Sequence, residues 1–246
     1  MRIGTAGWSI PRDEAASFAG DGQQLDRYSR VMNCCEINSS FYRSHRLETY
    51  QRWASQTPAD FRFSVKLPRS ITHEARLRRA RAPLQAFLAE VAGLGDRLGA
   101  LLVQLPPSLI FEARPVRRFF DLLAERYEGA VVVEPRHASW FTAAADRALV
   151  AARVSRAAAD PALSPEARQP GGWLGPEGDG RGTVLYYRWH GSPRLYWSAY
   201  GDDWLSAQAQ DIRARWHIKA NANVWCIFDN TAAGCALPNA RRFMAL

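Results

Sequence analysis

The 246 residues of this chain match the usual length of one α/β barrel and suffice to bury a sizeable core, so we expect a single domain over residues 1–246. Hydrophobic residues make up 47% and charged residues 23%, which excludes a disordered or fibrous chain. The net charge of +8 favours an anionic partner, a phosphorylated small molecule or a nucleic acid, although evenly dispersed charge would serve only solubility.

The beginning of the chain, Met1-Arg2-Ile3-Gly4, enters a strand-like run without the apolar stretch and cleavage site of a signal peptide. No segment approaches the roughly 20 consecutive apolar residues that a membrane span needs. The four cysteines lack the paired spacing of a zinc or redox motif, which favours reduced thiols. We therefore expect a cytoplasmic protein with no membrane partner and no cofactor. The sequence does not indicate its oligomeric state.

Short strand-like runs and longer helix-like segments alternate along the first two thirds of the chain. In chain order they predict the strand Arg2–Gly7, the helix Gln24–Met32, the strand Cys34–Asn38, the helix Leu47–Ser55, the strand Phe61–Lys66, the helix Pro83–Leu94, the strand Ala100–Gln104, the helix Pro115–Arg126, the strand Ala130–Glu134, the helix Ala144–Ala152 and the strand Val154–Ala159. This alternation predicts a parallel sheet, because parallel strands need long crossover connections.

The stretch Pro161–Gly182 interrupts the alternation, since its glycines and prolines show neither a helical face nor strand alternation. We interpret it as a long loop and a candidate lid. Beyond it we predict the strand Val184–His190, a helix about Trp204–Trp216, the strand Asn223–Phe228 and a short terminal segment from Asn239. The total of about eight strands predicts a TIM-type (β/α)8 barrel of the α/β class, irregular where the loop replaces the helix between strands six and seven. An open doubly wound sheet is the alternative, but no G-x-G-x-x-G follows the first strand.

Polar side chains follow nearly every predicted strand. In a barrel the carboxyl ends of the strands converge on one mouth, so we expect these residues to form one site. The candidates, in chain order, are Glu36, Asn38, Tyr42, Lys66, His73, Gln104, Glu134, Arg136, His137, Trp140, Asp160, Arg188, His190 and Asn230. His45 and His217 lie in helix-like or loop contexts and are left out of the site.

Each candidate also has a purely structural interpretation. An inward carboxylate such as Glu36 or Glu134 can simply pair with an inward arginine. Aromatic side chains beside the strands can stack on a bound ring or pack against their neighbours. These aromatic residues are Trp8, Tyr42, Trp140, Tyr187 and Tyr200.

A series of motifs runs through nearly the whole chain. They are Ile3–Trp8 (IGTAGW), Glu36–Arg43 (EINSSFYR), Phe61–Lys66 (FRFSVK), Ile71–His73 (ITH), Gly95–Gly99 (GDRLG), Gln104–Ser108 (QLPPS), Val133–Trp140 (VEPRHASW), Tyr187–Gly191 (YRWHG), and Asn230 with Gly234, Asn239 and Ala240. In this order they resemble the YecE-like family, also called the domain of unknown function DUF72. The resemblance implies a TIM-type barrel and marks these polar residues as characteristic of the family, but it supplies no reaction. Pro135, Ala138 and Asp229 depart from the family's pattern, where an aromatic residue, a proline and an asparagine are usual, and Asp229 adds a negative charge to the mouth.

The favoured hypothesis is an enzyme, a hydrolase or a lyase, that uses acid/base chemistry on a small anionic (phosphorylated) or sugar-like substrate. Its proton-transfer candidates are Glu36 and Glu134, and His137 or His190 could titrate near neutral pH. The other roles are anion binding by Lys66, Arg136 and Arg188, and orientation of substrate oxygens by Asn38, Gln104 and Asn230.

Two alternatives remain open. In a nucleic-acid-binding protein or phosphodiesterase, the arginines would neutralise phosphates, and a divalent metal would need ligands among His73, His137 and His190. In a non-catalytic binding or scaffold protein, Glu–Arg pairs would satisfy a closed mouth.

Overall fold

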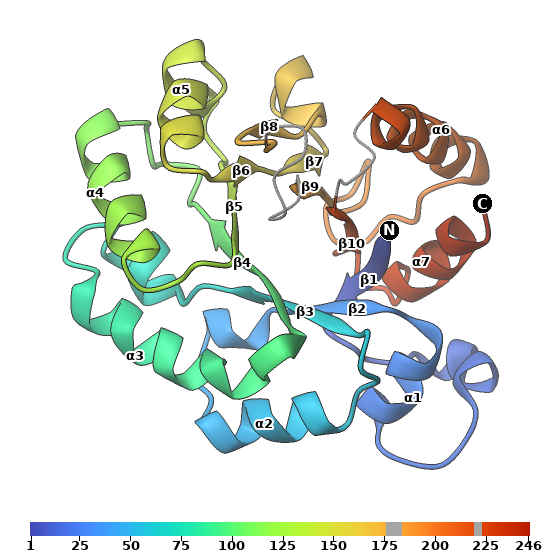
Figure 1. Ribbon diagram of the computed structural model, residues 1–246. Coiled ribbons are helices and arrows are strands. Elements are labelled where there is room, and N and C mark those ends of the chain that lie inside the picture. Colours follow the sequence, from blue (N-terminus) through green and yellow to red (C-terminus); the bar gives the residue numbers. More distant parts are fainter. Residues whose placement is uncertain (176–183, 219–222) are drawn as a thin grey trace.

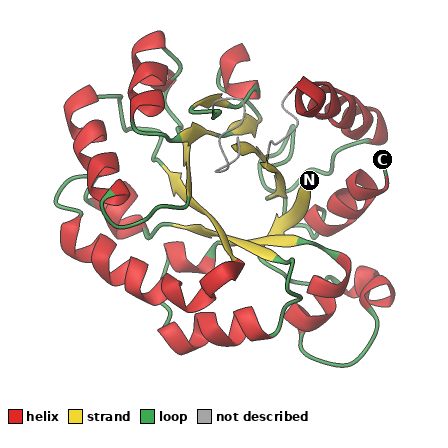
Figure 2. Ribbon diagram, in the orientation of Figure 1, coloured by secondary structure: helices red, strands yellow, loops and turns green. Residues whose placement is uncertain are grey.

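The computed structural model describes residues 1–175, 184–218 and 223–246. Figure 1 looks along the axis of a nearly closed ring of strands, and Figure 2 shows the helices outside that ring. The architecture is that of an irregular TIM-type barrel, which confirms the fold class expected from the alternation of strands and helices.

Ten strands of the described ranges form one sheet. They are β1 (Arg2–Ala6), β2 (Cys34–Ile37), β3 (Arg62–Lys66), β4 (Leu98–Gln104), β5 (Ala130–Glu134), β6 (Ser155–Arg156), β7 (Ala158–Asp160), β8 (Gly171–Gly172), β9 (Val184–Trp189) and β10 (Asn223–Phe228). Their order in the sheet is β7-β9-β10-β1-β2-β3-β4-β5-β6-β8. The pairing of β6 with β8 is antiparallel and the other described pairings are parallel.

The sixth position of the barrel is divided between two strands. β6 pairs with β5, and β7 pairs with β9, so the two pieces together connect the two halves of the ring. The single strand predicted over Val154–Ala159 is therefore interrupted at Ala157. The interruption coincides with β8, whose Gly171 and Gly172 pair with β6 on the edge that would otherwise face β9.

Six α-helices of the described chain agree with the predicted ones to within three residues at each end, and the terminal segment forms a seventh. They are α1 (Gln24–Val31), α2 (Leu47–Ser55), α3 (Arg81–Val91), α4 (Ala113–Ala124), α5 (Ala143–Ala151), α6 (Asp202–Ile218) and α7 (Ala236–Ala245). The last begins before the terminal segment expected from Asn239 and packs against β1 and β10, which brings the two ends of the chain close together (Figure 1). No helix of the described ranges is both long and apolar enough to span a bilayer.

Helical periodicity explains how these helices cover the barrel. In α4 the buried residues are Val116, Phe119, Phe120 and Leu123, a spacing of three, one and three that places them on one face. In α3 a spacing of three and four places the buried residues Leu84, Phe87 and Val91 on one face as well. Both helices therefore hold their apolar face against the strands and leave their charged residues outside.

The connection from β7 to β9 contains no α-helix within its described residues, as predicted. It does contain a short 3-10 turn, Pro165–Arg168, and the strand β8. The expectation that Pro161–Gly182 has no strand is thus wrong at Gly171–Gly172, where the pairing with β6 overrides the low strand propensity of glycine. Residues 176–182 of the candidate lid lie outside the described residues, so the lid stays a prediction.

The side chains inside the barrel change from apolar to charged along the barrel axis. Residues two apart on a strand point to the same face of the sheet. The interior is filled by a buried cluster made of Cys34, Leu102, Val132, Ala157, Val184, Tyr186, Trp225 and Ile227. Two residues further along five of these strands come Glu36, Gln104, Glu134, Arg188 and Asp229. The strands thus place a charged layer directly above an apolar one, toward their carboxyl ends.

Candidate functional site

Arg188, on β9, lies at the centre of the charged layer and is fully buried. Its Nε donates to Glu36 Oε2 at 2.9 Å and its Nη2 to Glu36 Oε1 at 2.6 Å, which makes a bidentate pair. Its Nη1 donates to Glu134 Oε2 at 2.5 Å, and Nη2 also donates to Asp229 Oδ2 at 3.1 Å. One guanidinium therefore joins carboxylates that come from β2, β5 and the end of β10.

Neutral side chains complete the hydrogen bonding of the two glutamates. Tyr186 donates its hydroxyl to Glu36 Oε2 at 3.0 Å, and Gln104 Nε2 donates to Glu134 Oε2 at 3.1 Å. Both glutamates are fully buried. A buried carboxylate is stable only when it is paired and hydrogen-bonded, and each of these meets that condition.

The cations of the layer control the pKa values of its carboxylates. Burial alone would raise the pKa of Glu134, but Arg136, Arg188 and His190 hold it well below its ordinary value. Burial would also raise the pKa of Asp229, and there Arg188 and His190 lower it. A carboxyl group with a lowered pKa is a poor proton carrier near neutral pH, which argues against the proton-transfer role predicted for Glu134.

His190 links the two ends of this network. Its Nδ1 faces Asp229 Oδ2 at 2.9 Å, so Nδ1 carries a proton while Asp229 is ionised, because a carboxylate can only accept. Its Nε2 lies 2.9 Å from Glu134 Oε1 and 2.9 Å from Arg136 Nη2. A neutral ring accepts from Arg136 there, and a protonated ring donates to Glu134. The Nε2 atom therefore faces one donor and one acceptor, both at hydrogen-bonding distance.

Lys66 ends β3 at the edge of the layer and is buried. Its Nζ lies over the Phe41 ring, 4.1 Å from the ring centroid. In the described part of the chain, no carboxylate forms an ion pair with this ammonium. Burial lowers the pKa of Lys66 to about 8, and the positive charge of Arg188 adds to that effect. The amine is therefore partly uncharged in mildly alkaline solution.

The remaining polar residues of the mouth form its rim. Asn38 Nδ2 lies 3.4 Å from Asp229 Oδ1, and His73 packs edge-on against Phe41. Burial lowers the pKa of His73, and the charges of Lys66, Arg69 and Arg136 add to the lowering, which indicates a cationic rim. Tyr42 is 73% exposed beside Phe41.

Two predicted residues of the fifth loop point away from the charged layer. His137 Nδ1 accepts from the backbone N–H of Ser139 at 3.2 Å and holds the short turn that follows β5. Trp140 is fully buried, and its Nε1 donates to the carbonyl of Leu109 at 2.9 Å. Their contacts are structural, and neither touches Glu134 or Arg188.

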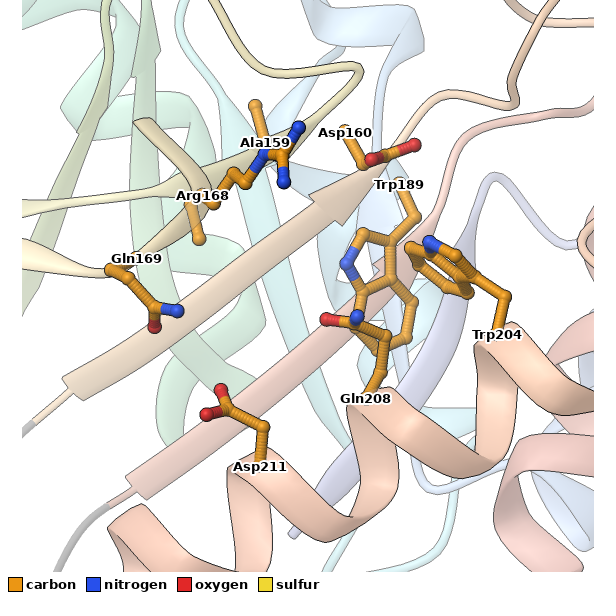
Figure 3. Close-up of a pocket in the computed structure, with 9 residues that line it drawn as sticks. Ala159, Asp160, Arg168, Gln169, Trp189, Trp204, Gln208 and Asp211 are labelled. Atoms are coloured by element: carbon orange, nitrogen blue, oxygen red, sulfur yellow. The ribbon is translucent and has the colours of Figure 1, made fainter. Parts of the chain in front are cut away.

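Asp160 lies on the outer side of the barrel wall. It accepts a hydrogen bond from the Tyr200 hydroxyl at 2.8 Å. Together with Trp189 of β9 and Gln208 of α6 it lines a cavity of about 310 Å³ between the strands and α6 (Figure 3). This cavity occupies the place where a regular barrel has a helix between strands six and seven, so the structure separates Asp160 from the central layer.

Asn230 supports the loop after β10. Its Nδ2 donates to the carbonyl of Ser198 and to Asn239 Oδ1, both at 3.0 Å. The same Asn239 Oδ1 accepts from the backbone N–H of Tyr200. Asn230 therefore ties the loops that follow β9 and β10 to α7, and no described contact joins it to Arg188.

Tyr186 and Tyr196 were absent from the predicted set, and Asp229 was expected at the mouth as a negative charge without a functional role. Asp229 and Tyr186 contact the charged layer directly, and the strand alternation that places Arg188 inside also places Tyr186 inside, two residues earlier. Tyr196 packs edge-on against His190 at 5.6 Å between ring centroids. It belongs to an irregular loop, where no periodic signal exists.

The two histidines left out of the predicted site are His45 and His217. His45 packs between Tyr50 and Trp53 and bonds Ser39, in agreement with its exclusion from the site. The side chain of His217 lies outside the described residues. Among the side chains that the structure does describe, no three of His, Cys, Asp or Glu are arranged to hold a metal ion.

The chain matches known proteins along its whole length. The model of the family described as "Protein of unknown function DUF72" matches residues 2–246. The protein named UPF0759 protein YecE from Escherichia coli (strain K12) is 33% identical over 140 residues, which cover 56% of this chain and 49% of that protein. The match thus spans about half the length of these curated relatives.

Solved structures support the same fold. A DUF72 family protein from Thermotoga maritima aligns with a TM-score of 0.77 at 22% identity, over 99% of this chain and 97% of that chain. A DUF72 family protein from Enterococcus faecalis aligns with a TM-score of 0.76 at 18% identity, over 99% and 94%. At such identities the likeness concerns the fold alone.

Proposed function

Because the chain belongs to DUF72, a family of proteins of unknown function whose name supplies no reaction, we propose its function from the geometry of the charged layer. The protein is an enzyme that transfers protons on a small anionic substrate, phosphorylated or sugar-like, at the barrel mouth. The observation that carries this proposal is Lys66, a buried amine at the edge of the charged layer, with its pKa lowered to about 8 and no carboxylate partner among the described residues.

Lys66 is better suited to proton transfer than the two glutamates. Arg188 holds both oxygens of Glu36 and one oxygen of Glu134, and the other oxygen of Glu134 pairs with Arg136. Their role in the proposal is to hold Arg188 and His190 in place. A lysine with a pKa near neutrality can act as a general base when uncharged and as a general acid when protonated. His190 Nε2 is the second group that can exchange a proton.

The charges at the mouth favour an anionic group on the substrate. Glu36 and Glu134 are fully buried and paired with Arg188, whereas Arg136, whose Nη2 lies 2.8 Å from Glu134 Oε1, keeps 20% of its side chain exposed. Arg136 Nε and Asn38 Oδ1 are buried without a hydrogen-bond partner in the described chain. A substrate that offers both an acceptor and a donor would satisfy them.

We propose a cytoplasmic location as well. All four cysteines are free, and Cys34, Cys35 and Cys226 are buried, which suits a reducing compartment. Fractionation of expressing cells tests this, and recovery of the protein in an oxidising compartment would contradict it.

A ligand screen by thermal shift tests the function. A ligand that binds only the folded state raises the melting temperature, so phosphorylated sugars are compared with neutral sugars, nucleotides and short single-stranded DNA. We expect a phosphorylated sugar to stabilise the wild type and to lose at least tenfold in affinity in Lys66→Met and in Arg136→Gln.

The control for this screen is Arg147→Gln, which removes one exposed arginine on α5, away from the mouth. It should bind as the wild type does. Stabilisation by DNA alone would favour the nucleic-acid alternative, and stabilisation that survives both mouth variants would place the ligand elsewhere. Either result contradicts the proposal.

A further inference from the structure

Two neighbouring helices begin beside each other at the end of the barrel where the strands finish. α3 follows the loop after β3, and α4 follows the loop after β4. Between their first turns lies a groove of about 710 Å³. Its charged lining consists of Arg78, Arg79, Arg81, Arg114 and Arg118, with Glu112 as the one carboxylate among the described lining residues.

The groove has a large excess of positive charge. Its lining carries five guanidinium groups and one carboxylate, a charge of +4, and Arg81 also lies 3.9 Å from Glu125 outside the lining. Glu112 is already bound to Arg78 at 3.0 and 3.1 Å. Arg79, Arg114 and Arg118 are exposed and form no ion pair with any carboxylate in the part of the chain that the structure describes.

The positive charge of the groove lies at the N-terminal ends of α3 and α4. Neither α3 nor α4 has an acidic residue in its first turn or a side-chain cap, so the first N–H groups have no side-chain acceptor. Arg81 and Arg114 instead add positive charge at the positive end of each helix dipole. This arrangement is unfavourable in the free protein, and a bound anion would relieve it.

The backbone before α3 is held in a strained shape. Arg76, Leu77 and Arg79 have φ values of 51°, 64° and 50°, in the left-handed region that non-glycine residues rarely adopt. Arg76 fastens this turn to the next loop through two hydrogen bonds of 2.9 Å to Ser108. Such strain persists where a structure positions functional groups, and here the turn carries Arg78 and Arg79 into the groove.

We propose that this groove binds an oligophosphate anion, as a site separate from the charged layer. The groove has the volume of a small-ligand site. The charge of +4 suits a compact ligand with three or four negative charges, and arginines recognise phosphate oxygens bidentately. Among the described lining residues the one aromatic side chain, Phe119, is buried, so they offer no exposed ring for stacking a nucleic-acid base.

Calorimetric titration with sodium tripolyphosphate at constant ionic strength tests the proposal. The test variant is Arg114→Gln/Arg118→Gln. The control is Arg117→Gln/Arg147→Gln, which removes the same charge from exposed positions on α4 and α5 outside the groove. We expect at least a tenfold rise in Kd for the test variant and less than a twofold change for the control. The unliganded Arg114→Gln protein should melt no lower than the wild type.

Three results would overturn the proposal. The groove would be ordinary surface charge and not a binding site if the wild-type protein did not bind tripolyphosphate. The same conclusion would follow if both double variants lost the same affinity for tripolyphosphate. A loss of the same size in Lys66→Met would place the anion in the barrel mouth. Tenfold tighter binding of a 12-nucleotide DNA through Arg114 and Arg118 would assign the groove to a nucleic-acid backbone instead.

Discussion

The guanidinium of Arg188 pairs with three buried carboxylates at once. It lies within 3.1 Å of carboxylate oxygens from Glu36, Glu134 and Asp229. Three acidic side chains could not stay this close together in the interior without it, because like charges repel strongly where water is excluded. The residue therefore determines both the stability and the charge of the mouth.

Removal of this centre should destabilise the protein strongly. Arg188→Met leaves three buried carboxylates without their common partner, and we expect the free energy of unfolding to fall by about 3–5 kcal/mol, the usual range for a broken buried pair. Urea denaturation measures it. Arg147→Met, at an exposed position, should change it by less than about 0.5 kcal/mol. Equal stabilities of the two variants would show that Arg188 is not the centre of the network.

The lowered pKa values of Glu134 and Asp229 predict the response to acid. Each group has a lower pKa in the folded protein than in the unfolded chain, so its contribution to stability is present above the unfolded values of 4.5 and 3.8. It is lost as the pH falls below them toward the folded values. We expect unfolding free energy to decrease below about pH 4.5, with a shallower slope in Glu134→Gln. Identical slopes would contradict the assignment.

Lys66 should lower stability at neutral pH. Its pKa is depressed from 10.5 to about 8, so the penalty for holding its charge is complete below the folded value and vanishes as the pH rises through 10.5. Each pKa unit corresponds to about 1.4 kcal/mol, and we expect Lys66→Met to raise stability at pH 7 by on the order of 2 kcal/mol. The gain should shrink at pH 9.5. An unchanged or lower stability at pH 7 would show that the charge is well compensated.

At the scale of the elements, most of the barrel could be predicted from the sequence. Strand and helix periodicities differ enough that seven of the eight strand positions agree to within two residues. The exception is Ser155–Asp160, because its division depends on pairing with Gly171–Gly172, and such a long-range contact leaves no trace in local propensity. The same limit applies to Asp160, which the interrupted strand directs to an outer cavity.

Candidate residues on the strands were predicted more successfully than candidate residues in the loops. Glu36, Gln104, Glu134 and Arg188 all lie on strands, and the structure brings them together. His137 and Trp140 follow a strand end but turn away, because loop direction depends on local hydrogen bonds such as that of Ser139 to His137. Residues on the strands of a barrel therefore converge at the carboxyl ends of the strands, whereas residues in the loops that follow do so less regularly.

The loop after β9 depends on a single glycine. Gly191 has a φ of +90°, and a Cβ there would lie 2.7 Å from the carbonyl oxygen of Ser198. We expect Gly191→Ala to cost about 1–3 kcal/mol in unfolding free energy, measured by chemical denaturation. The control is Gly201→Ala, where an added Cβ meets nothing within 4 Å. A Gly191 variant as stable as the control would refute the tight packing of this loop.

At the scale of the whole molecule, the barrel separates two kinds of positive charge. In the part of the chain that the structure describes, Arg136 and Arg188 of the mouth pair with buried carboxylates and Lys66 does not, whereas Arg79, Arg114 and Arg118 between α3 and α4 form no ion pair. The net charge of +8 therefore does not describe either site by itself. Composition predicted an anionic partner, and only the folded chain shows where such a partner would find uncompensated charge.

The most direct test of the account is the ionisation of Lys66. Lysine labelled with ¹³C at Cε gives few signals, because Lys66 and Lys219 are the chain's two lysines, and the Lys66→Arg variant identifies the signal. We predict that the Lys66 signal titrates with a midpoint near 8 and shifts when a phosphorylated sugar is added. A midpoint near the ordinary value of 10.5, with no response to any anion, would contradict the proposed role of the mouth in proton transfer.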